Sequence, residues 1–349
     1  MLDLGLSFLG SVARDPNALA VVDGELRLTY GQWYRRISAL VAGLDSLGLA
    51  PGERVVTALQ NRWEAATLHW ACQFAGVIVT PVNWRSTAGE LDFFLQDAEA
   101  KAVVYEETST AAIRGSQLSA RLPRIAVDSV SPGDTPFAAL TDGDRPEARP
   151  RVNAEARSVM LYTSGTTARP KGVPRRQRAE RAAALAHVAQ NLYGRSERTL
   201  GVMPLYHTMG VRSLLAMSLV GGAFICLRRF DPAEALRLIA TERVTNLYLV
   251  PTLYHDLVHH PSFAETDTIS VRKLGFAGAP MTDGLLKRLQ AAFRPDLFVN
   301  HYGSSEIYTF TIDLDAKAVE LRQARIGLGR RIVHAAVPCR RGAAAGSGL

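Results

Sequence analysis

The 349 residues, 47% of them hydrophobic, are enough to bury one large α/β core or two smaller ones. The formal net charge of +7 is unevenly placed, because six arginines and no acidic residue follow position 320. Without those six, 34 basic and 33 acidic residues remain. The basic character therefore belongs to the C-terminal tail, which excludes a nucleic-acid-binding face and a nucleic-acid partner.

The chain also lacks signals for a membrane or an oxidising compartment. No apolar run approaches the roughly 18–20 residues that span a bilayer. Asp3 stands where a secretory signal carries positive charge, so we expect no export signal and a cytoplasmic location. Three widely spaced cysteines, Cys72, Cys226 and Cys339, argue against a disulfide framework or a structural zinc site.

Short β-rich runs alternate with helical patterns along most of the chain, which predicts α/β architecture with largely parallel strands. The expected strands are 55–59, 76–82, 102–105, 158–162, 200–203, 223–227, 246–250, 273–277 and 298–301. Helix starts are predicted where Thr87 and Glu90 have the spacing of a capping box, and at Asp231, which precedes a first-turn proline. An apolar stripe predicts a further helix after Thr29.

Composition divides the chain into two expected subdomains and a tail. Residues 129–150, rich in Pro, Gly, Asp and Thr, predict an exposed connection between an α/β subdomain of residues 1–150 and a second one of residues 151–330. Residues 331–349 show no pattern that could build a packed element, so a disordered, low-complexity tail is expected there.

The most informative segment is 161–172, Leu-Tyr-Thr-Ser-Gly-Thr-Thr-Ala-Arg-Pro-Lys-Gly, which follows directly on a predicted strand. Hydroxyls and backbone N–H groups of such a loop can surround phosphate oxygens, and the ammonium of Lys171 can neutralise departing pyrophosphate. Lysine is informative here because arginine outnumbers it 35 to 5. The segment lacks the Gly-Lys-Ser/Thr ending of a Walker A loop. A solvated Ser/Thr-rich turn is the alternative that composition alone would favour.

This segment resembles the signature phosphate loop of the adenylate-forming superfamily, which includes acyl- and aryl-CoA synthetases, luciferase and peptide-synthetase adenylation domains. The match departs at Ala168, where the family has glycine, so a stiffer loop or weaker nucleotide binding is expected. Over about the first 330 residues the chain is most similar to aryl-CoA ligases of the benzoate and chlorobenzoate kind. The resemblance implies the large N-terminal domain of that fold, with stacked, mostly parallel sheets and flanking helices.

Three further segments follow in the family's order. The segment 203–210 resembles the one whose histidine orients the substrate carboxylate, although a lone histidine after a strand is more often a structural hydrogen-bonding residue. The segment 275–280 resembles the adenine wall, where small residues let a planar base approach. The segment 300–306 resembles the Tyr-Gly-x-Thr-Glu motif, with Ser305 in place of threonine. There Tyr302 can stack on adenine and Glu306 can hold Mg²⁺.

The resemblance assigns roles to residues of this chain. The expected catalytic residues are Lys171, Thr166, Glu306 and His207, with Glu306 also the metal ligand. The expected ATP-binding residues are Thr163, Ser164, Gly165, Thr166, Thr167, Lys171, Gly278, Ala279, Pro280, Asn300, His301, Tyr302, Gly303, Ser304 and Ser305. The expected substrate-binding residues are His207, Met209, Gly210, Phe276, Ile307 and Tyr308.

Two other patterns are given ordinary interpretations. His255 and His259 have the i, i+4 spacing of a zinc-binding helix, but no third ligand is evident, so a metal site is not favoured. The arginines between 175 and 181 are interpreted as a solvated helix start, or at most as contributors to the field around a phosphate-rich ligand. The arginines concerned are Arg175, Arg176, Arg178 and Arg181.

The implied reaction has two steps: a carboxylate, expected to be aromatic, attacks the α-phosphate of ATP, and the thiol of CoA then displaces AMP. The implied cofactors are ATP, Mg²⁺ and CoA. The family's ribose-binding aspartate segment and small C-terminal domain are not found after Glu306. We therefore expect a truncated or frameshifted ligase with impaired activity. A non-catalytic ATP- or acyl-adenylate-binding fragment and a domain that loads a carrier protein remain alternatives, and a homodimer stays open.

Overall fold

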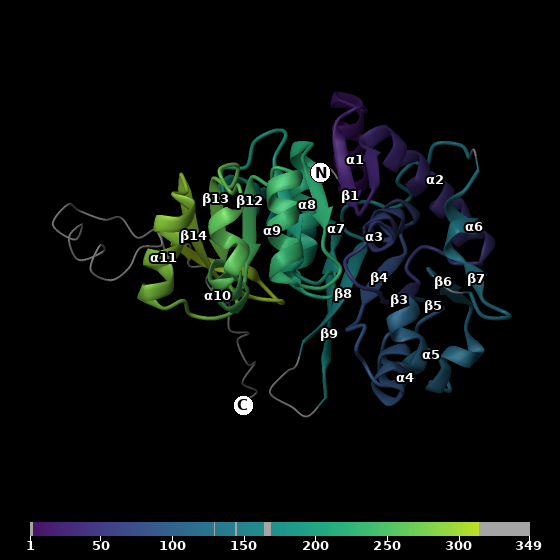
Figure 1. Ribbon diagram of the computed structural model, residues 1–349. Helices are drawn as coiled ribbons and strands as arrows, with labels where there is room; N and C mark the ends of the chain where they lie inside the picture. Colours follow the sequence, from purple (N-terminus) through teal and green to yellow (C-terminus); the bar gives the residue numbers. More distant parts are fainter. Residues whose placement is uncertain (1–2, 129, 144, 164–168, 314–349) are drawn as a thin grey trace, which may run out of the picture.

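The computed structural model describes residues 3–128, 130–143, 145–163 and 169–313. Within these residues, two stacked sheets of seven and eight strands enclose one layer of helices and carry further helices on their outer faces (Figure 1). The predicted α/β class, with mostly parallel sheets and flanking helices, is confirmed. Each of the nine predicted strands overlaps an observed one.

The seven-stranded sheet has the order β7-β6-β5-β3-β4-β8-β9 and is parallel except for the β8–β9 pair. Its outer face is covered by α4 (Ala88–Asp97) and α5 (Thr110–Gly115), which bury a cluster that includes Leu91, Phe94 and Ile113. Its strands are β3 (Arg54–Ala58), β4 (Ile78–Pro81), β5 (Ala102–Tyr105), β6 (Arg124–Ala126), β7 (Thr135–Pro136), β8 (Arg157–Thr163) and β9 (Lys171–Arg176).

The eight-stranded sheet has the order β15-β14-β13-β12-β10-β11-β1-β2, with antiparallel pairs only at its two edges among the described strands. Its outer face is covered by α9 (Pro232–Thr241), α10 (Pro251–His259) and α11 (Asp283–Phe293). Its strands are β1 (Leu19–Asp23), β2 (Leu26–Thr29), β10 (Arg198–Gly201), β11 (Ala223–Cys226), β12 (Asn246–Leu249), β13 (Lys273–Phe276), β14 (Leu297–Ser304) and β15 (Tyr308–Asp313).

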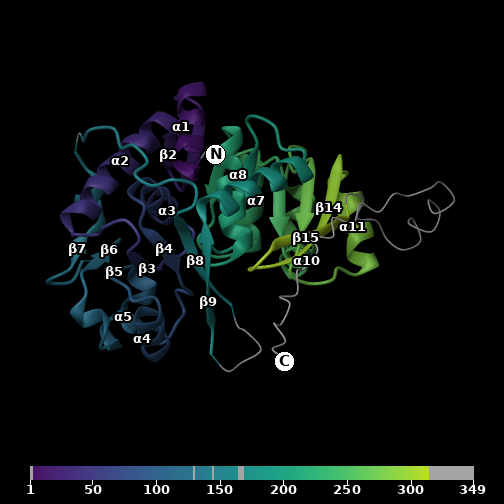
Figure 2. The ribbon, with the colours of Figure 1, turned by 180° about the vertical axis from the view of Figure 1, so that it is seen from behind.

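The helices between the sheets build the largest core, seen from behind in Figure 2. They are α1 (Leu4–Arg14), α2 (Tyr30–Ser46), α3 (Trp63–Ala75), α7 (Gln177–Gln190) and α8 (Thr208–Val220). Short 3₁₀ turns at Glu107–Ser109, Ser119–Arg121 and Pro261–Glu265 complete the connections. Among the described residues, every helix is too short or too polar to cross a membrane.

Successive residues of the central strands enter different cores. Val55 of β3 packs in the core between the sheets, whereas Val56 packs under α4. In β11, Phe224 faces the same central core and Ile225 faces α9 to α11. Because both faces of such strands are covered, their sequences are continuous apolar runs, and this is why they could be predicted.

The chain exchanges strands between the two sheets. The β1–β2 hairpin joins the eight-stranded sheet through β11, where Val21 lies beside Phe224. The β8–β9 hairpin joins the seven-stranded sheet through β4, where Val79 lies beside Val159. Each sheet therefore contains strands from both sides of residue 150. The division into subdomains at that residue stays a prediction.

Residues 129–150 are more structured than expected. They contain β7 and a short helix, α6 (Phe137–Thr141), whose apolar side chains enter the central core. Phe137 is only 2% exposed and packs edge-on against the ring of Trp63. The prediction of an exposed connection is wrong for this part. A helix of five residues is too short to show a periodic apolar pattern.

Asn61, just after β3, links one sheet to the other. Its Nδ2 donates to the carbonyl oxygens of Gly201 and Met203, at 2.9 and 2.7 Å, and its Oδ1 accepts from the N–H of Leu205 at 3.1 Å. The side chain is buried, so these backbone groups have no water to replace it. Asn61 thereby fixes the path of the chain that leaves β10 and leads to His207.

Replacing Asn61 by alanine should lower the free energy of unfolding by roughly 2–4 kcal/mol, because three buried backbone groups lose their partner. Urea denaturation followed by circular dichroism measures the change. Asn17, an exposed asparagine, provides the matched control: Asn17→Ala should shift the free energy of unfolding by less than about 0.5 kcal/mol. Equal effects of the two substitutions would show that the Asn61 link does not stabilise the fold.

Candidate functional site

The predicted phosphate loop lies at the tip of the β8–β9 hairpin. Thr163 of β8 and Lys171 of β9 face each other as the last register pair before the tip. Lys171 is exposed. The β8–β9 hairpin extends beyond the other strands of the seven-stranded sheet (Figure 1). The predicted residues Ser164, Gly165, Thr166 and Thr167 lie outside the described residues. The structure thus gives the two ends of the loop.

The second predicted segment forms the turn between β14 and β15. Glu306 is exposed there, and hydrogen bonding from the side chain of Ser304 and from its own backbone lowers its pKa, with the charge of Arg175 contributing. An ionised, accessible carboxylate fits the oxygen ligands that Mg²⁺ requires. Gly303 is required by this turn, because a Cβ at that position would lie 1.4 Å from the carbonyl oxygen of Tyr308.

The third predicted segment forms the start of α8. His207 is the N-cap residue, exposed at the surface, and the protein around its ring lowers its pKa by partial desolvation. A neutral imidazole at pH 7 can donate one hydrogen bond to a carboxylate. Met209 is buried behind it. Gly210 lets α8 pack closely, since a Cβ would lie 2.2 Å from the carbonyl oxygen of Pro204.

A buried arginine joins these three segments. Nη1 of Arg175, on β9, donates to the carbonyl oxygen of Ser305 at 2.7 Å and to Oγ1 of Thr208 at 3.2 Å. Its Nε forms an ion pair of 2.7 Å with Glu180 of α7. The phosphate hairpin, the His207 helix and the Glu306 turn are therefore brought to one place. The prediction of a solvated arginine is wrong for Arg175, which is only 5% exposed.

The other three arginines of that run have different environments. Arg176 and Arg178 are exposed and pair with Glu155. Arg181 is partly buried and its Nε donates to Oγ of Ser7 at 2.7 Å. Only Arg175 thus reaches the candidate site, because its side chain points to the buried face of β9 while that of its neighbour Arg176 points to solvent.

The predicted adenine-binding residues lie at the carboxyl ends of two neighbouring strands. β13 and β14 pair in parallel, with Phe276 beside Asn300, so the turn of Gly278, Ala279 and Pro280 and the exposed Tyr302 lie at the same edge of the sheet. Gly278 has a φ of +86°, a conformation that favours glycine. Ligands of parallel α/β sheets bind at this edge.

Two predicted residues point elsewhere. Phe276 is 2% exposed and packs against Phe298 in the core under α9 to α11. His301 is also 2% exposed, on the opposite face of its sheet, and its Nε2 lies 3.3 Å from Oδ1 of Asn191. Burial lowers the pKa of His301 to about 3, helped by the charge of Arg212. A contact between His301 and a nucleotide would have to use its backbone.

Ile307 and Tyr308 were both predicted to bind the substrate, but the structure exposes the first and buries the second. Ile307 is exposed, whereas Tyr308 is buried and its hydroxyl donates to the carboxylate of Glu180. The guanidinium groups of Arg175 and Arg212 lie over the Tyr308 ring. Tyr308 therefore belongs to a buried cluster of charged and aromatic groups behind the site.

Sequence reasoning missed three members of this cluster: Arg175, Glu180 and Arg212. One signal could have found Arg212, which stands within the otherwise apolar run of α8, since a charged residue on a buried helix requires a partner. Burial raises the pKa of Glu180 to about 7, while the charges of Arg175 and Arg212 lower it in part.

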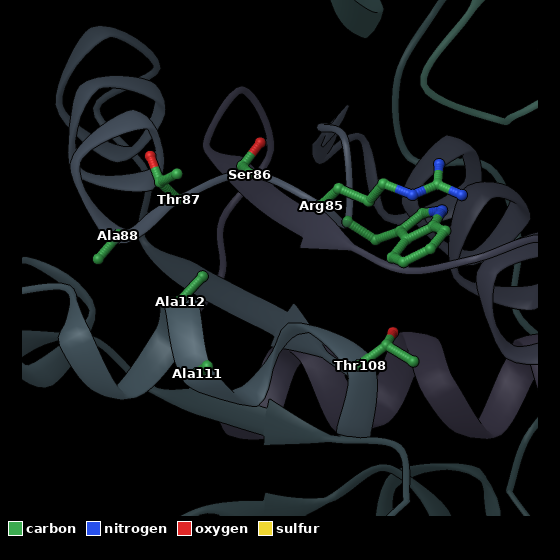
Figure 3. A pocket seen from close by; sticks show the side chains of 8 residues that line it. Arg85, Ser86, Thr87, Ala88, Thr108, Ala111 and Ala112 are labelled. Carbon is green, nitrogen blue, oxygen red and sulfur yellow. The ribbon is translucent and has the colours of Figure 1, made fainter.

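A separate pocket lies beside α4 and α5 (Figure 3). The guanidinium of Arg85 lies over the ring of Trp84, 3.8 Å from its centroid, at one side of this pocket. None of the predicted site residues lines it. Its lining residues are Trp84, Arg85, Ser86, Thr87, Ala88, Thr108, Ala111 and Ala112.

His255 and His259, the pair with the spacing of a zinc-binding helix, contact each other and their own helix. The rings of His255 and His259 stack with centroids 4.1 Å apart. Nδ1 of His259 lies 2.7 Å from the carbonyl oxygen of His255, and its Nε2 lies 2.8 Å from Nη1 of Arg288. Within the described part of the chain, no three His, Cys, Asp or Glu side chains are grouped so as to hold a metal ion.

Comparison with solved structures identifies the class. The N-terminal domain of FACL13 from Mycobacterium tuberculosis superposes with a TM-score of 0.82 and 25% identity, covering 92% of this chain and 81% of that one. A putative long-chain-fatty-acid CoA ligase from Rhodopseudomonas palustris gives a TM-score of 0.82 and 26% identity, covering 90% and 78%. The fold is that of the N-terminal domain of the adenylate-forming enzymes.

The family follows from the sequence match. A family model described as AMP-binding enzyme matches residues 8–337, so the chain belongs to the AMP-binding enzyme family. Feruloyl-CoA synthase from Amycolatopsis sp is 31% identical over 313 residues, 86% of this chain and 59% of that protein. The 4-chlorobenzoate–CoA ligase of Arthrobacter sp is 30% identical over 332 residues, 94% and 62%. The chain thus spans about three fifths of the length of these relatives, and the predicted family is confirmed.

The raised pKa of Glu180 predicts a pH dependence of stability. Between pH 4.5, the ordinary pKa, and about 7 the unfolded chain has lost this proton while the folded chain keeps it, so the free energy of unfolding falls as pH rises. Glu180→Gln removes this contribution. Relative to the unsubstituted protein, its free energy of unfolding should rise by roughly 1–3 kcal/mol across that interval, measured by urea denaturation.

Glu155→Gln is the control, because Glu155 is an exposed carboxylate that also pairs with arginine. Its stability should follow that of the unsubstituted protein across the same pH range. If Glu180→Gln gave a curve parallel to this control, Glu180 would titrate as an ordinary surface carboxylate.

Proposed function

We propose that this chain forms the adenylating part of an AMP-forming carboxylic acid:CoA ligase. In the first step a carboxylate oxygen of the acid attacks the α-phosphorus of ATP and pyrophosphate leaves, giving an acyl-adenylate. In the second step the CoA thiol attacks the acyl carbon, forming the thioester and releasing AMP and a proton. The second step is assigned to the whole protein, since the chain spans only part of its relatives' length.

The observation that carries this proposal is the meeting of three segments at Arg175. The β8–β9 hairpin, the start of α8 and the Glu306 turn come from distant parts of the sequence, and hydrogen bonds from one guanidinium reach two of them. Phosphoryl chemistry needs such placement more than it needs an acid or base, because positioning and charge stabilisation provide most of the catalysis.

Each exposed residue then has a role in the first step. In the proposed mechanism Lys171 neutralises the phosphates, and His207 donates a hydrogen bond to the substrate carboxylate. The ionised carboxylate of Glu306 and the oxygens around it suit Mg²⁺, which when bound offsets the negative charge of the triphosphate. Tyr302, 69% exposed, offers a ring on which the adenine can stack.

The acid is proposed to be aromatic. Two relatives that support this are named feruloyl-CoA synthase and 4-chlorobenzoate–CoA ligase. A third relative, at 28% identity, is named long-chain-fatty-acid–CoA ligase, so an aliphatic acid is the competing class.

Exchange of labelled pyrophosphate into ATP, dependent on benzoate-type acids, tests the first step directly. Exchange with aromatic acids and little with fatty acids of similar solubility would support the proposal. Tight ATP binding without acid-dependent exchange would instead identify a binding protein. If a completed protein transferred the acyl group to a carrier-protein thiol in preference to CoA, the acceptor would have to be reassigned.

Lys171→Ala should lower the rate of acid-dependent pyrophosphate exchange more than tenfold, a loss of about 1.4 kcal/mol of transition-state stabilisation. The reason is the loss of the cation expected to face the phosphates. Lys101→Ala is the matched control, since Lys101 is also an exposed lysine at the start of a strand. Unchanged exchange with Lys171→Ala would mean that the phosphates bind elsewhere.

A further inference from the structure

Tyr308, the first residue after the Glu306 turn, has a strained backbone. Its φ of +59° lies in the left-handed region, which favours glycine, and a bulky side chain adopts it only where its surroundings hold it there. The strand pairing is irregular at the same place, because the register of β14 with β15 shifts between Tyr302 and Gly303. This combination next to a proposed metal ligand indicates that the turn is held in one particular shape.

Buried charged groups hold the Tyr308 ring in this position. The guanidinium groups of Arg175 and Arg212 lie over the ring. The hydroxyl of Tyr308 donates to the carboxylate of Glu180 on α7, the helix that packs beside β15 (Figure 2). All four side chains are at most 9% exposed. Since water does not reach these groups, a lost contact has no replacement there.

Two hydrogen bonds tie the turn, and the residue after Tyr308, to the same arginines. Nη1 of Arg175 donates to the carbonyl oxygen of Ser305, in the turn itself, at 2.7 Å. Nη1 of Arg212 donates to Oγ1 of Thr309 at 2.6 Å. Only residues 305–307 separate β14 from β15, so these two bonds and the Tyr308 ring leave the turn little conformational freedom.

Both arginines have partners for their charge within the protein. The Nε of Arg175 forms an ion pair of 2.7 Å with Glu180, and Arg175 also lies near enough to Glu306 for the two charges to attract. Arg212 hydrogen-bonds with Tyr248, and the charge of Glu180 attracts it as well. The two cations are therefore engaged in holding the protein around the turn.

Glu306 itself is exposed on this turn, where its carboxylate accepts a hydrogen bond from the side chain of Ser304. An exposed carboxylate on a mobile backbone would have to be ordered each time it bound a cation, at a cost in conformational entropy. A backbone that is already fixed avoids this cost, and groups that orient a metal ligand from behind contribute to metal affinity. The contacts behind the Glu306 turn therefore affect how tightly the turn can hold a cation.

We propose that Tyr308 is a positioning residue for Glu306. Its buried ring, together with the bond from Arg212 to Thr309, fixes the turn so that the carboxylate of Glu306 meets the Mg²⁺ that accompanies ATP. This inference rests on the proposed function, since it concerns the metal ligand of the same site. It gives Tyr308 a role other than the contact with the acid that the family resemblance implies.

Two substitutions that each remove one hydrogen bond and almost preserve shape test the proposal: Tyr308→Phe and Thr309→Val. Calorimetric titration of the full 349-residue chain with ATP, once with excess Mg²⁺ and once with EDTA, gives the gain in ATP affinity that the metal provides. Tyr308→Phe should lower this gain about tenfold, with little change of the affinity in EDTA. An unchanged gain would overturn the inference. If Tyr308→Phe does not fold, Thr309→Val decides in the same way.

Tyr34→Phe is the matched control. It also removes the hydroxyl of a buried tyrosine, which donates to the carbonyl oxygen of Ala148 at 2.7 Å in the central core. This control should lower the free energy of unfolding and leave the gain from Mg²⁺ unchanged. An equal loss of the gain in Tyr34→Phe would show that any weakening of the fold has this effect, and would contradict a specific role of Tyr308.

A double substitution shows whether Tyr308 acts through Glu306. Glu306→Gln should lower the gain from Mg²⁺, and the addition of Tyr308→Phe should lower it no further, because two residues that act as one unit are not additive. Additive losses would contradict the proposal.

The same titrations separate this inference from the proposed function. If Glu306→Gln lowers the gain from Mg²⁺ and Tyr308→Phe does not, the proposed function stands and the positioning role is wrong. If Glu306→Gln leaves the gain unchanged, or if the unsubstituted chain binds no ATP, the proposed site falls and this inference with it.

Discussion

The candidate site depends on one buried guanidinium. Arg175 projects from β9 into the space between α7 and α8, where its Nε pairs with Glu180 and its Nη1 donates to the carbonyl oxygen of Ser305 and to Thr208. Breaking a buried ion pair from one side leaves an uncompensated charge that costs several kcal/mol. The contacts of Arg175 hold three segments from distant parts of the sequence in fixed positions relative to one another.

The cluster around Arg175 also explains how two different environments meet at the site. On the solvent side, His207, Glu306 and Tyr302 are exposed and can contact polar ligands. On the interior side, burial shifts the pKa values of Glu180 and the histidines toward their neutral forms, while the arginines keep their charge. The site thus has exposed polar groups on its solvent side and buried arginines behind them.

Much of the fold could be predicted because its central strands are covered on both faces and read as continuous apolar runs. Six strands were missed: β1, β2, β6, β7, β9 and β15. Four of them, β2, β7, β9 and β15, lie at the edges of their sheets, where strands are often short or rich in charge and lack a continuous apolar run. The motifs located the phosphate hairpin, His207 and Glu306, but not Arg175. Nothing local distinguishes Arg175 from Arg176, its exposed neighbour; only the tertiary packing of α7 and β15 decides which is buried.

The pairing of β1 with β11 determines when the N-terminal hairpin can fold during translation. Val21 pairs with Phe224, so a hairpin made near the start of translation cannot reach its place until about two hundred further residues have left the ribosome. Until then its apolar strands stay uncovered and open to wrong pairing or to capture by chaperones. For the same reason, a cut near the middle of the gene would yield two polypeptides that each lack strands of their own sheets, and co-expression would have to restore both.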